Sequence, residues 1–459
     1  MRKPDKPRKE EEDTWAWHTE PVSKSQEGPT QVIAAGNNIS RSLLLLAGSI
    51  VVVFLLTVAG DRIAGRFSAA SLPPGSRELI FPPNSEHSFE TCDFKYTAHI
   101  NSLGLRDREI GPKKPGTFRI AMIGDSFTYG MGVDIEQAWI KQLEQNLQKA
   151  GYDVEVINVG KPGAGPPFFA EMAEKAVPIL QPDLISVSML QFDDLLQSTR
   201  EGLEGLPANH MVLDAVKSVY PNLVRLVRIA QQARQVAANV QPVTPPQKTT
   251  AEDNRRWTAK TANDFHERMT PEERVRFDRL EDAVKTAYLA GRLIPGVISL
   301  AMQDPEYGQF TRNINDPRTQ TLIQNLSEQL ARIKRVAEDY NAKLVVVAIP
   351  SGPFVNRAAL NSFTRMGGAL PGDIDVLRPD IMDKEVRIAS DVMDKEVRTA
   401  CDKAGVRMFE VMEGFRKHVD EKGLYFDLDP HFTPTGNKLF AELVTPAFIK
   451  EIGDKAKKK

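Results

Sequence analysis

Residues 118–132, FRIAMIGDSFTYGMG, decide the fold class of this chain. The apolar run Ile120–Ile123 stops at the tripeptide Gly124-Asp125-Ser126. A short apolar run that ends in turn-forming residues is typical of a buried strand. Open α/β sheets bind their ligands at the carboxyl ends of the strands, so this pattern displays Ser126 where chemistry usually takes place. The tripeptide is also ordinary turn chemistry, and by itself it does not define a function.

Strand and helix patterns alternate after this stretch. Strands separated by amphipathic helices indicate an α/β fold with a doubly wound, flavodoxin-like parallel sheet. The expected strands are 118–123, 154–160, 183–192, 343–350 and 406–411, and the expected helices lie near 135–150, 168–180, 318–341 and 434–450.

A helical insertion at about 195–317 interrupts this alternation. Helical patterns near 209–239 and 271–290 flank a linker at 241–250 that is rich in Pro, Thr and Gln. Thr270 and Pro271 predict a helix start, because a threonine hydroxyl can cap the first turn and proline suits its first position. The insertion is either a lid over the site or a spacer, and the sequence favours neither.

Residues 42–60 carry no charged side chain over 19 positions. As a helix this run is about 28 Å long at ~1.5 Å per residue, close to the ~30 Å of a bilayer core. The 41 residues ahead of it exceed the basic region of a usual signal peptide, so we expect an uncleaved signal anchor rather than a cleaved signal. The amino-terminal flank carries seven Lys/Arg, and because long domains translocate regardless of charge, this short tail should decide the orientation and stay in the cytoplasm. The sequence therefore predicts a single-pass protein of the cell membrane with its large domain on the extracytoplasmic side.

These patterns divide the chain into predicted parts. Within the connecting region, FETCDFKYTAHI (89–100) alternates well enough for one or two strands. An 11-residue near-duplication at 380–390 and 391–401 lengthens a helix without rotating its apolar face. The predicted parts are a disordered cytoplasmic tail at 1–41, the anchor at 42–60, a connecting region at 61–116, the α/β domain at 117–450 and a basic tail at 451–459.

Composition argues against several classes of function. The net charge of −2 gives no reason to expect a nucleic-acid partner. Cys92 and Cys401 are too few for a disulfide framework, and they either pair in an oxidising compartment or are two free thiols. No cluster of His, Asp and Glu has metal-ligand spacing and no Walker-type phosphate loop is present, so we expect neither a metal nor another cofactor. The sequence does not indicate an oligomeric state.

A histidine on a turn is the second candidate for chemistry. His431 follows Asp429 by two residues in FDLDPHFTPTG, immediately before the last expected helix. Serine becomes a nucleophile when a histidine takes its proton, and a carboxylate usually holds that histidine. A loop turn lets both side chains face the sheet edge that carries Ser126. The alternative is a surface turn with an incidental histidine.

Two other strand ends offer donors for the oxyanion of an acyl transfer. Asn158-Val159-Gly160 ends the second expected strand, and Gly163 and Gly165 follow it. Such flexible backbone could aim N–H groups inward, although a plain strand-to-helix loop explains the same glycines. The third strand ends in Gln191-Phe192-Asp193-Asp194 at the same edge of the sheet.

Taken together, these segments resemble the SGNH/GDSL hydrolases. The likeness of Gly124-Asp125-Ser126-Phe127 to the first block implies Ser126 as the nucleophile, with its N–H as one oxyanion donor. Asn158-Val159-Gly160 is similar to the glycine block, which implies Gly160 as the second donor. Asp429-Pro430-His431 resembles the acid–base block, in the short form of membrane-anchored members and of relatives that acetylate or deacetylate polysaccharides. The resemblance covers roughly 118–192 and 318–450, and the run 101–111 also suits membrane-anchored members.

One block departs from the family pattern. The family's Gly-x-Asn-Asp falls on Gln191-Phe192-Asp193-Asp194, which puts aspartate where an amide normally donates to the oxyanion. An ionised Asp193 would repel that charge, and the loss of one donor costs about 10²–10³ in turnover in a worked protease case. Either Asp193 is protonated, or Gln191 supplies the amide, or activity is reduced or absent.

The resemblance implies a membrane-anchored serine esterase. Its substrate would be an ester, for example an O-acetyl group on a cell-envelope glycan. An O-acyltransferase that passes the acyl group to a polysaccharide hydroxyl would use the same three residues. The remaining alternative is a non-catalytic envelope scaffold or binding module, which Asp193 and the large insertion favour and the intact Ser, Asp and His positions oppose. The acyl group and the physiological substrate are not encoded in any motif.

Overall fold

The structure is a computed structural model. It describes residues 36–64 and 78–457, except for 192, 200, 202–215, 217, 239–243, 306, 308 and 370–394. Most of the predicted tail at 1–41, Phe192 and most of the near-duplication at 380–401 lie outside the described residues. The described end of the duplication, from residue 395, is helical to residue 404. The predicted boundaries of the five parts stay predictions.

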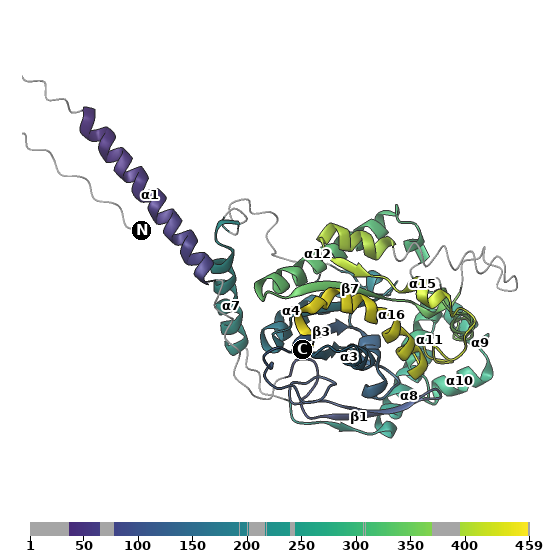
Figure 1. Ribbon diagram of the computed structural model, residues 1–459. Coiled ribbons are helices and arrows are strands. Elements are labelled where there is room, and N and C mark those ends of the chain that lie inside the picture. The colour runs from purple at the N-terminus through teal and green to yellow at the C-terminus, as the bar shows by residue number, and fades with distance from the viewer. Residues whose placement is uncertain are drawn as a thin grey trace, which may run out of the picture. The chain divides into compact units, whose positions relative to one another are not determined.

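A parallel sheet of five strands organises the large domain (Figure 1). The strand order β4-β3-β5-β7-β8 is the flavodoxin-like order in which the first strand of the sheet lies inside the second. This confirms the predicted doubly wound fold. The strands are β3 (Phe118–Gly124), β4 (Val154–Gly160), β5 (Leu184–Leu190), β7 (Lys343–Ile349) and β8 (Arg407–Phe409).

Helices cover both faces of this sheet. On one face α3 (Trp139–Lys149) and α16 (Pro434–Ile452) share a core with Met122 of β3. On the other face α4 (Pro166–Leu180) and α12 (Pro317–Asp339) pack over the alternate residues of the same strands. Because neither face meets water, the strands read as continuous apolar runs rather than alternating ones.

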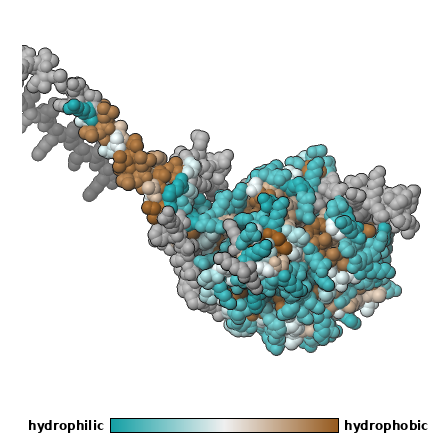
Figure 2. All heavy atoms as spheres, in the orientation of Figure 1, coloured by the Kyte–Doolittle hydropathy of each residue, from teal (hydrophilic) through white to brown (hydrophobic). Residues whose placement is uncertain are grey.

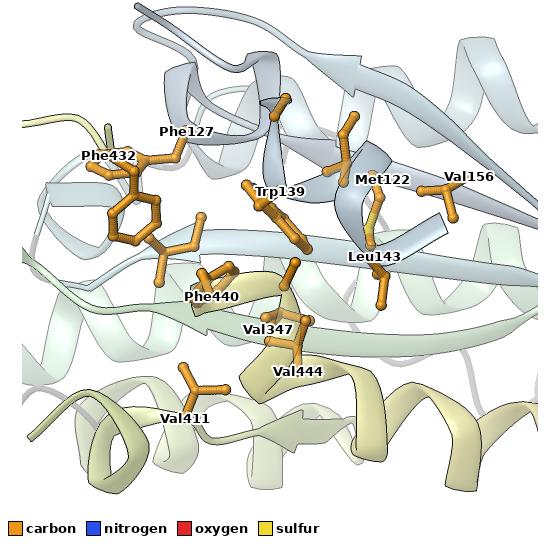
Figure 3. Close-up of a cluster of buried hydrophobic side chains, with 14 of the residues drawn as sticks. Met122, Phe127, Trp139, Leu143, Val156, Val347, Val411, Phe432, Phe440 and Val444 are labelled. Atoms are coloured by element: carbon orange, nitrogen blue, oxygen red, sulfur yellow. The ribbon is translucent and has the colours of Figure 1, made fainter. Parts of the chain in front are cut away.

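The core beneath α3 and α16 is built from large aromatic and aliphatic side chains (Figure 3). The Trp139 and Phe440 rings meet edge to face with centroids 4.9 Å apart. Both side chains are fully buried, and such a pair adds about 0.5–1.5 kcal/mol beyond its buried area. Helix α3 ends where predicted, since Gly151 adopts a left-handed φ of 89° two residues beyond its last residue.

A β-hairpin precedes the sheet. Strands β1 (Glu86–Glu90) and β2 (Lys95–His99) pair antiparallel, so the predicted one or two strands are two. The two-residue strand β6 (Lys248–Thr249) pairs parallel with β1. Strand β6 lies in the linker of the predicted insertion. Its pairing with β1 therefore joins the hairpin and the insertion in one small sheet.

The insertion is helical, as predicted, and has its own hydrophobic core. Its helix α8 (Ala251–Arg268) lies in a segment to which the sequence pattern assigned no helix. Thr270 caps α9 (Pro271–Asp278) as predicted, in a capping box with Glu273. Helix α5 (Asp193–Leu196) leads from β5 into the insertion, and the described residues of the insertion also form α7 (Pro221–Ala238), α10 (Asp282–Leu289), α11 (Pro295–Gln303) and the 3-10 helix η2 (Gln309–Arg312).

Short helices complete the description of the large domain. They are α2 (Ser126–Tyr129), η1 (Ile135–Gln137), η3 (Gly352–Phe354), α13 (Arg357–Arg365), α15 (Met412–Arg416) and η4 (Gly453–Ala456). The predicted helix 135–150 is therefore divided, with the 3-10 turn η1 ahead of α3.

The apolar run near the amino terminus forms helix α1 (Gly36–Ala64). Its segment Arg41–Ala64 is long and apolar enough to cross a membrane. Between its charged ends, at Arg41 and at Asp61 and Arg62, this segment exposes mainly apolar side chains, with Leu44 71% and Leu45 73% exposed (Figure 2). A helix of this kind is either a membrane span or a signal sequence.

Candidate active site

Ser126 begins the short helix α2, directly beyond the end of β3. The Asp125 side chain caps this helix, with its Oδ1 accepting from the N–H of Phe127 at 2.9 Å. Only glycine fits at position 124, because a Cβ there would lie 2.2 Å from Thr128 Oγ1 and 2.9 Å from a backbone carbonyl oxygen. The strand therefore turns sharply into the helix and leaves the serine at the carboxyl edge of the sheet.

The structure brings His431 and Asp429 to this serine. The Nε2 atom of His431 lies 2.7 Å from Ser126 Oγ, and its Nδ1 lies 2.5 Å from Asp429 Oδ1. The same carboxylate oxygen accepts from the backbone N–H of His431 at 3.0 Å, and the Phe127 ring packs 4.8 Å from the imidazole. A carboxylate on Nδ1 leaves Nε2 to accept a proton from the serine hydroxyl.

The charges around His431 favour its protonated form. Burial by itself lowers the pKa of His431, but the charge and hydrogen bond of Asp429, together with the charges of Asp125 and Asp193, outweigh it and raise that pKa. Burial also raises the pKa of Asp125 to about 7. The imidazolium formed when Ser126 gives up its proton is therefore well stabilised.

The loop that carries Asp429 and His431 is held from outside the sheet. Asp93, at the turn of the β1–β2 hairpin, accepts from the N–H of Leu428 at 2.6 Å. The Leu428 side chain packs against the core of the insertion. Arg365 of α13 pairs with Asp427 at 2.9 Å and with Glu281 of the insertion at 3.0 Å. The hairpin and the insertion thus form part of the support for the acid–base loop.

Gly160 does not offer the free donor that the sequence comparison implied. Its N–H donates to Asn158 Oδ1 at 2.9 Å. The glycine is required here for packing, because a Cβ at this position would lie 2.3 Å from the backbone nitrogen of Tyr129. Within the described part of the chain, the N–H groups of Ser126 and Gly163 have no hydrogen-bond acceptor. Gly163, with a left-handed φ of 72°, lies in the loop between β4 and α4.

Asp193 opens α5 at the end of β5 and is partly buried. Its Oδ2 accepts from Gln197 Nε2 at 2.7 Å, and its carboxylate also forms a hydrogen bond with the hydroxyl of Tyr307. Burial raises the pKa of Asp193, while both of these hydrogen bonds lower it. Gln191 is buried, its backbone N–H donates to the carbonyl oxygen of Ile349 at 3.0 Å, and the residue makes a further interaction.

Three residues near the site, Asp194, Asp93 and Tyr307, were not among the site residues that the sequence predicts. Asp194 is fully buried, and its Oδ2 accepts from the N–H of Leu190 at 2.7 Å. Its position directly after Asp193 was a usable signal. Asp93 and Tyr307 carried no such signal, because each lies in a segment far from the motif blocks and reaches the site only through tertiary packing.

The cysteines and possible metal ligands can be placed within the described residues. Cys92 is exposed and Cys401 is buried, and both are free thiols there. Among the same residues, no group of three His, Cys, Asp or Glu side chains is arranged to hold a metal ion.

Comparison with known families covers the first part of this site. Residues 122–293 match the model of the GDSL-like lipase/acylhydrolase family. The chain carries a GDSL-like lipase/acylhydrolase domain. The match identifies the chain as a serine hydrolase of ester bonds. The matched residues include Ser126 and end well before Asp429 and His431. No curated protein sequence matches the chain.

Solved structures of GDSL-type hydrolases align with most of the chain at low similarity. TesA shares 11% identity and covers 73% of this chain and 99% of its own, with a TM-score of 0.32. A lipase/acylhydrolase from Enterococcus faecalis shares 12% identity over 74% of this chain and 98% of its own, with a TM-score of 0.31. A catalytic mutant of the acetylxylan esterase Axe2 from Geobacillus stearothermophilus shares 12% identity over 73% and 94%, with a TM-score of 0.32.

Proposed function

We propose that this GDSL-type domain cleaves its ester through Ser126, His431 and Asp429. The observation that carries the proposal is the continuous pair of contacts from Ser126 Oγ to His431 Nε2 at 2.7 Å and from His431 Nδ1 to Asp429 Oδ1 at 2.5 Å. Serine attacks the ester carbonyl while histidine takes its proton. Histidine then returns the proton to the leaving alcohol, and a water completes hydrolysis of the acyl-enzyme by the same steps.

The oxyanion of this reaction would be bound by backbone groups. The N–H of Ser126 at the start of α2 is the first donor, and the loop after β4, with the N–H of Gly163, supplies the second. Asp193 accepts hydrogen bonds from its neighbours, which argues against its acting as the amide donor that the family places there. Two backbone donors are enough for substantial stabilisation, because each is worth roughly 3–4 kcal/mol in a worked case.

The second part of the proposal concerns place and substrate. Helix α1 is apolar over a length that suits a bilayer, which supports a single-pass anchor at the cell membrane with the hydrolase domain on its extracytoplasmic side. An enzyme held there meets cell-envelope polymers, so an O-acetyl group on an envelope glycan is the ester that we propose to test first. An acyl transfer to a sugar hydroxyl would use the same residues and differs only in its acceptor.

Labelling by a fluorophosphonate tests the nucleophile and the base together. The wild-type protein should be labelled, and labelling should be lost in Ser126→Ala and fall by at least about 10³-fold in His431→Ala. Ser102→Ala, at an exposed serine hydroxyl bonded to Glu109, is the matched control and should label like the wild type. Labelling that survives Ser126→Ala, or is unaffected by His431→Ala, would refute the assignment.

A further inference from the structure

Exposed apolar side chains gather where helix α1 ends and α7 begins. Beyond residue 60, the large apolar side chains that the described part of the chain exposes in this region are Ile63 in the last turn of α1, Val216 just ahead of α7, and Leu223 and Val227 on α7. Single exposed apolar residues are ordinary on a protein surface, whereas a group of them marks a contact surface.

The apolar residues of α7 form a stripe along one side of the helix. Leu223 is 52% and Val227 is 49% exposed, and Ala230 is also exposed. Residues spaced by four and by three positions lie on one face of a helix. Arg228 lies on the opposite face, where it pairs with Asp339 of α12 at 2.9 Å. Helix α7 therefore packs on the domain through its arginine face, and its apolar stripe points away from the domain.

One carboxylate joins α7 to the predicted anchor. Asp61 directly follows the apolar run 42–60 and is only 3% exposed. Its Oδ1 accepts from the N–H of Leu223 at 2.7 Å, and its Oδ2 accepts from Asn222 Nδ2 at 3.1 Å. A carboxylate is favourable here, because the first N–H groups of a helix have no partner within the helix. A membrane span that ends at residue 60 brings Asp61, and with it the first turn of α7, to the bilayer surface.

We propose that the stripe of Leu223, Val227 and Ala230 lies in the interface of the phospholipid bilayer, where Asp61 holds it. An interfacial helix buries its apolar face about 5–10 Å into the boundary between headgroups and acyl chains. Helix α7 has no acidic residue that anionic headgroups would repel. This second attachment restricts rotation of the hydrolase domain about its anchor. The inference rests on the proposed function, because it requires α1 to be a membrane anchor.

Nitroxide accessibility tests the proposal in the full chain, reconstituted in vesicles of phosphatidylcholine and phosphatidylglycerol. The label is attached at Val227→Cys in a Cys92→Ser background, since Cys401 is buried. Dissolved oxygen concentrates in lipid, whereas a nickel chelate stays in water. Oxygen should therefore relax the Val227 label more strongly than the chelate does.

A matched control is a label at Val275→Cys in the same background. Val275 lies on α9 and is 51% exposed, against 49% for Val227, and here the chelate should relax the label more strongly than oxygen. Asp61→Ala removes the acceptor of the Leu223 N–H and should make the Val227 label more accessible to the chelate. Leu223→Glu places a charge in the stripe and should act in the same direction, so the test stands even where Asp61→Ala does not fold. Equal midpoints of thermal unfolding show that the labelled proteins are folded.

The results that would overturn the inference are distinct from a failure of the anchor. The inference fails if the chelate relaxes the Val227 label more strongly than oxygen in a chain that resists a carbonate wash. It also fails if oxygen is preferred equally at Val227 and Val275, or if neither Asp61→Ala nor Leu223→Glu changes the Val227 label. Dipolar broadening between Val227 labels, abolished by dilution with unlabelled chain, would place a second copy on the stripe instead. If carbonate releases the chain, the anchor itself is refuted and the inference with it.

Discussion

At the scale of single residues, Arg106 shows how far the nucleophile depends on side chains outside its own motif. Its buried guanidinium donates to the carbonyl oxygens of Gly130 and Val133, both at 2.6 Å, and lies 4.7–4.8 Å from the ring centroids of Tyr96 and Tyr129. Charged hydrogen bonds are each worth about 1.5–3 kcal/mol when buried. Arg106 therefore fixes the turn that follows the Ser126 helix.

Replacing Arg106 by alanine should lower the free energy of unfolding by at least about 3 kcal/mol, since the carbonyl oxygens it satisfies lose their donor. Urea unfolding followed by tryptophan fluorescence measures the change. Arg318→Ala is the control, because Arg318 pairs with Asp316 at an exposed site and such pairs contribute about 0–1 kcal/mol. Equal effects of the two substitutions would contradict the assigned role.

A second prediction at the scale of single residues concerns Asp429. Asp429→Asn keeps the shape of the side chain and removes the charge that raises the pKa of His431. We expect kcat to fall by about 10⁴-fold, as in the comparable substitution of a serine protease. The acidic limb of kcat/KM should also move to lower pH, because the histidine loses stabilisation of its charged form. Unchanged turnover would show that another carboxylate orients the imidazole.

At the scale of elements, the β1–β2 hairpin and the acid–base loop work as one unit. Asp93 accepts from the Leu428 N–H at 2.6 Å, and burial raises the pKa of Asp93 to about 6. The hairpin also packs into the sheet-edge core, where Phe94 meets Phe426 with ring centroids 5.1 Å apart. A loop that carries both Asp429 and His431 needs such support, because a small misplacement of a base costs large factors in rate.

Asp93→Ala should therefore reduce kcat by about 10-fold or more while it lowers the free energy of unfolding by only about 1–2 kcal/mol. The comparison of ester turnover with thermal unfolding separates these effects. Asp420→Ala, which breaks an exposed pair with Arg357 at 2.8 Å, should change neither quantity appreciably. A loss of stability without a loss of turnover would mean that Asp93 serves the fold alone.

At the scale of the whole molecule, helix α1 should make the chain an integral membrane protein. An anchored chain keeps its full mass of 51.1 kDa and stays in the pellet after an alkaline carbonate wash. Placing aspartate at Val52 and Leu55, near the middle of the apolar run, should release it, since each charge costs about 2.5–3.5 kcal/mol of insertion. A soluble product that lacks the amino-terminal segment would indicate a cleaved signal instead.

Several features of this protein follow from local sequence. The strand 154–160 and the capping of α9 by Thr270 are confirmed because each rests on local rules: apolar runs form buried strands, and a threonine hydroxyl caps a helix. The strand order also follows, because alternating strands and helices leave few topologies to choose from. The same rules left α8 unassigned, since its polar surface carries only a weak apolar stripe.

Tertiary structure alone decided which side chains meet at Ser126. Motif spacing indicated His431 and Asp429 as candidates. Folding brings His431 Nε2 to 2.7 Å from Ser126 Oγ and His431 Nδ1 to 2.5 Å from Asp429 Oδ1. Folding also directs the N–H of Gly160 to Asn158 Oδ1 and forms the hydrogen bond between the Tyr307 hydroxyl and the Asp193 carboxylate. Local sequence sets backbone conformation over a few residues, whereas hydrogen-bond partners hundreds of residues apart are chosen by packing of the finished core.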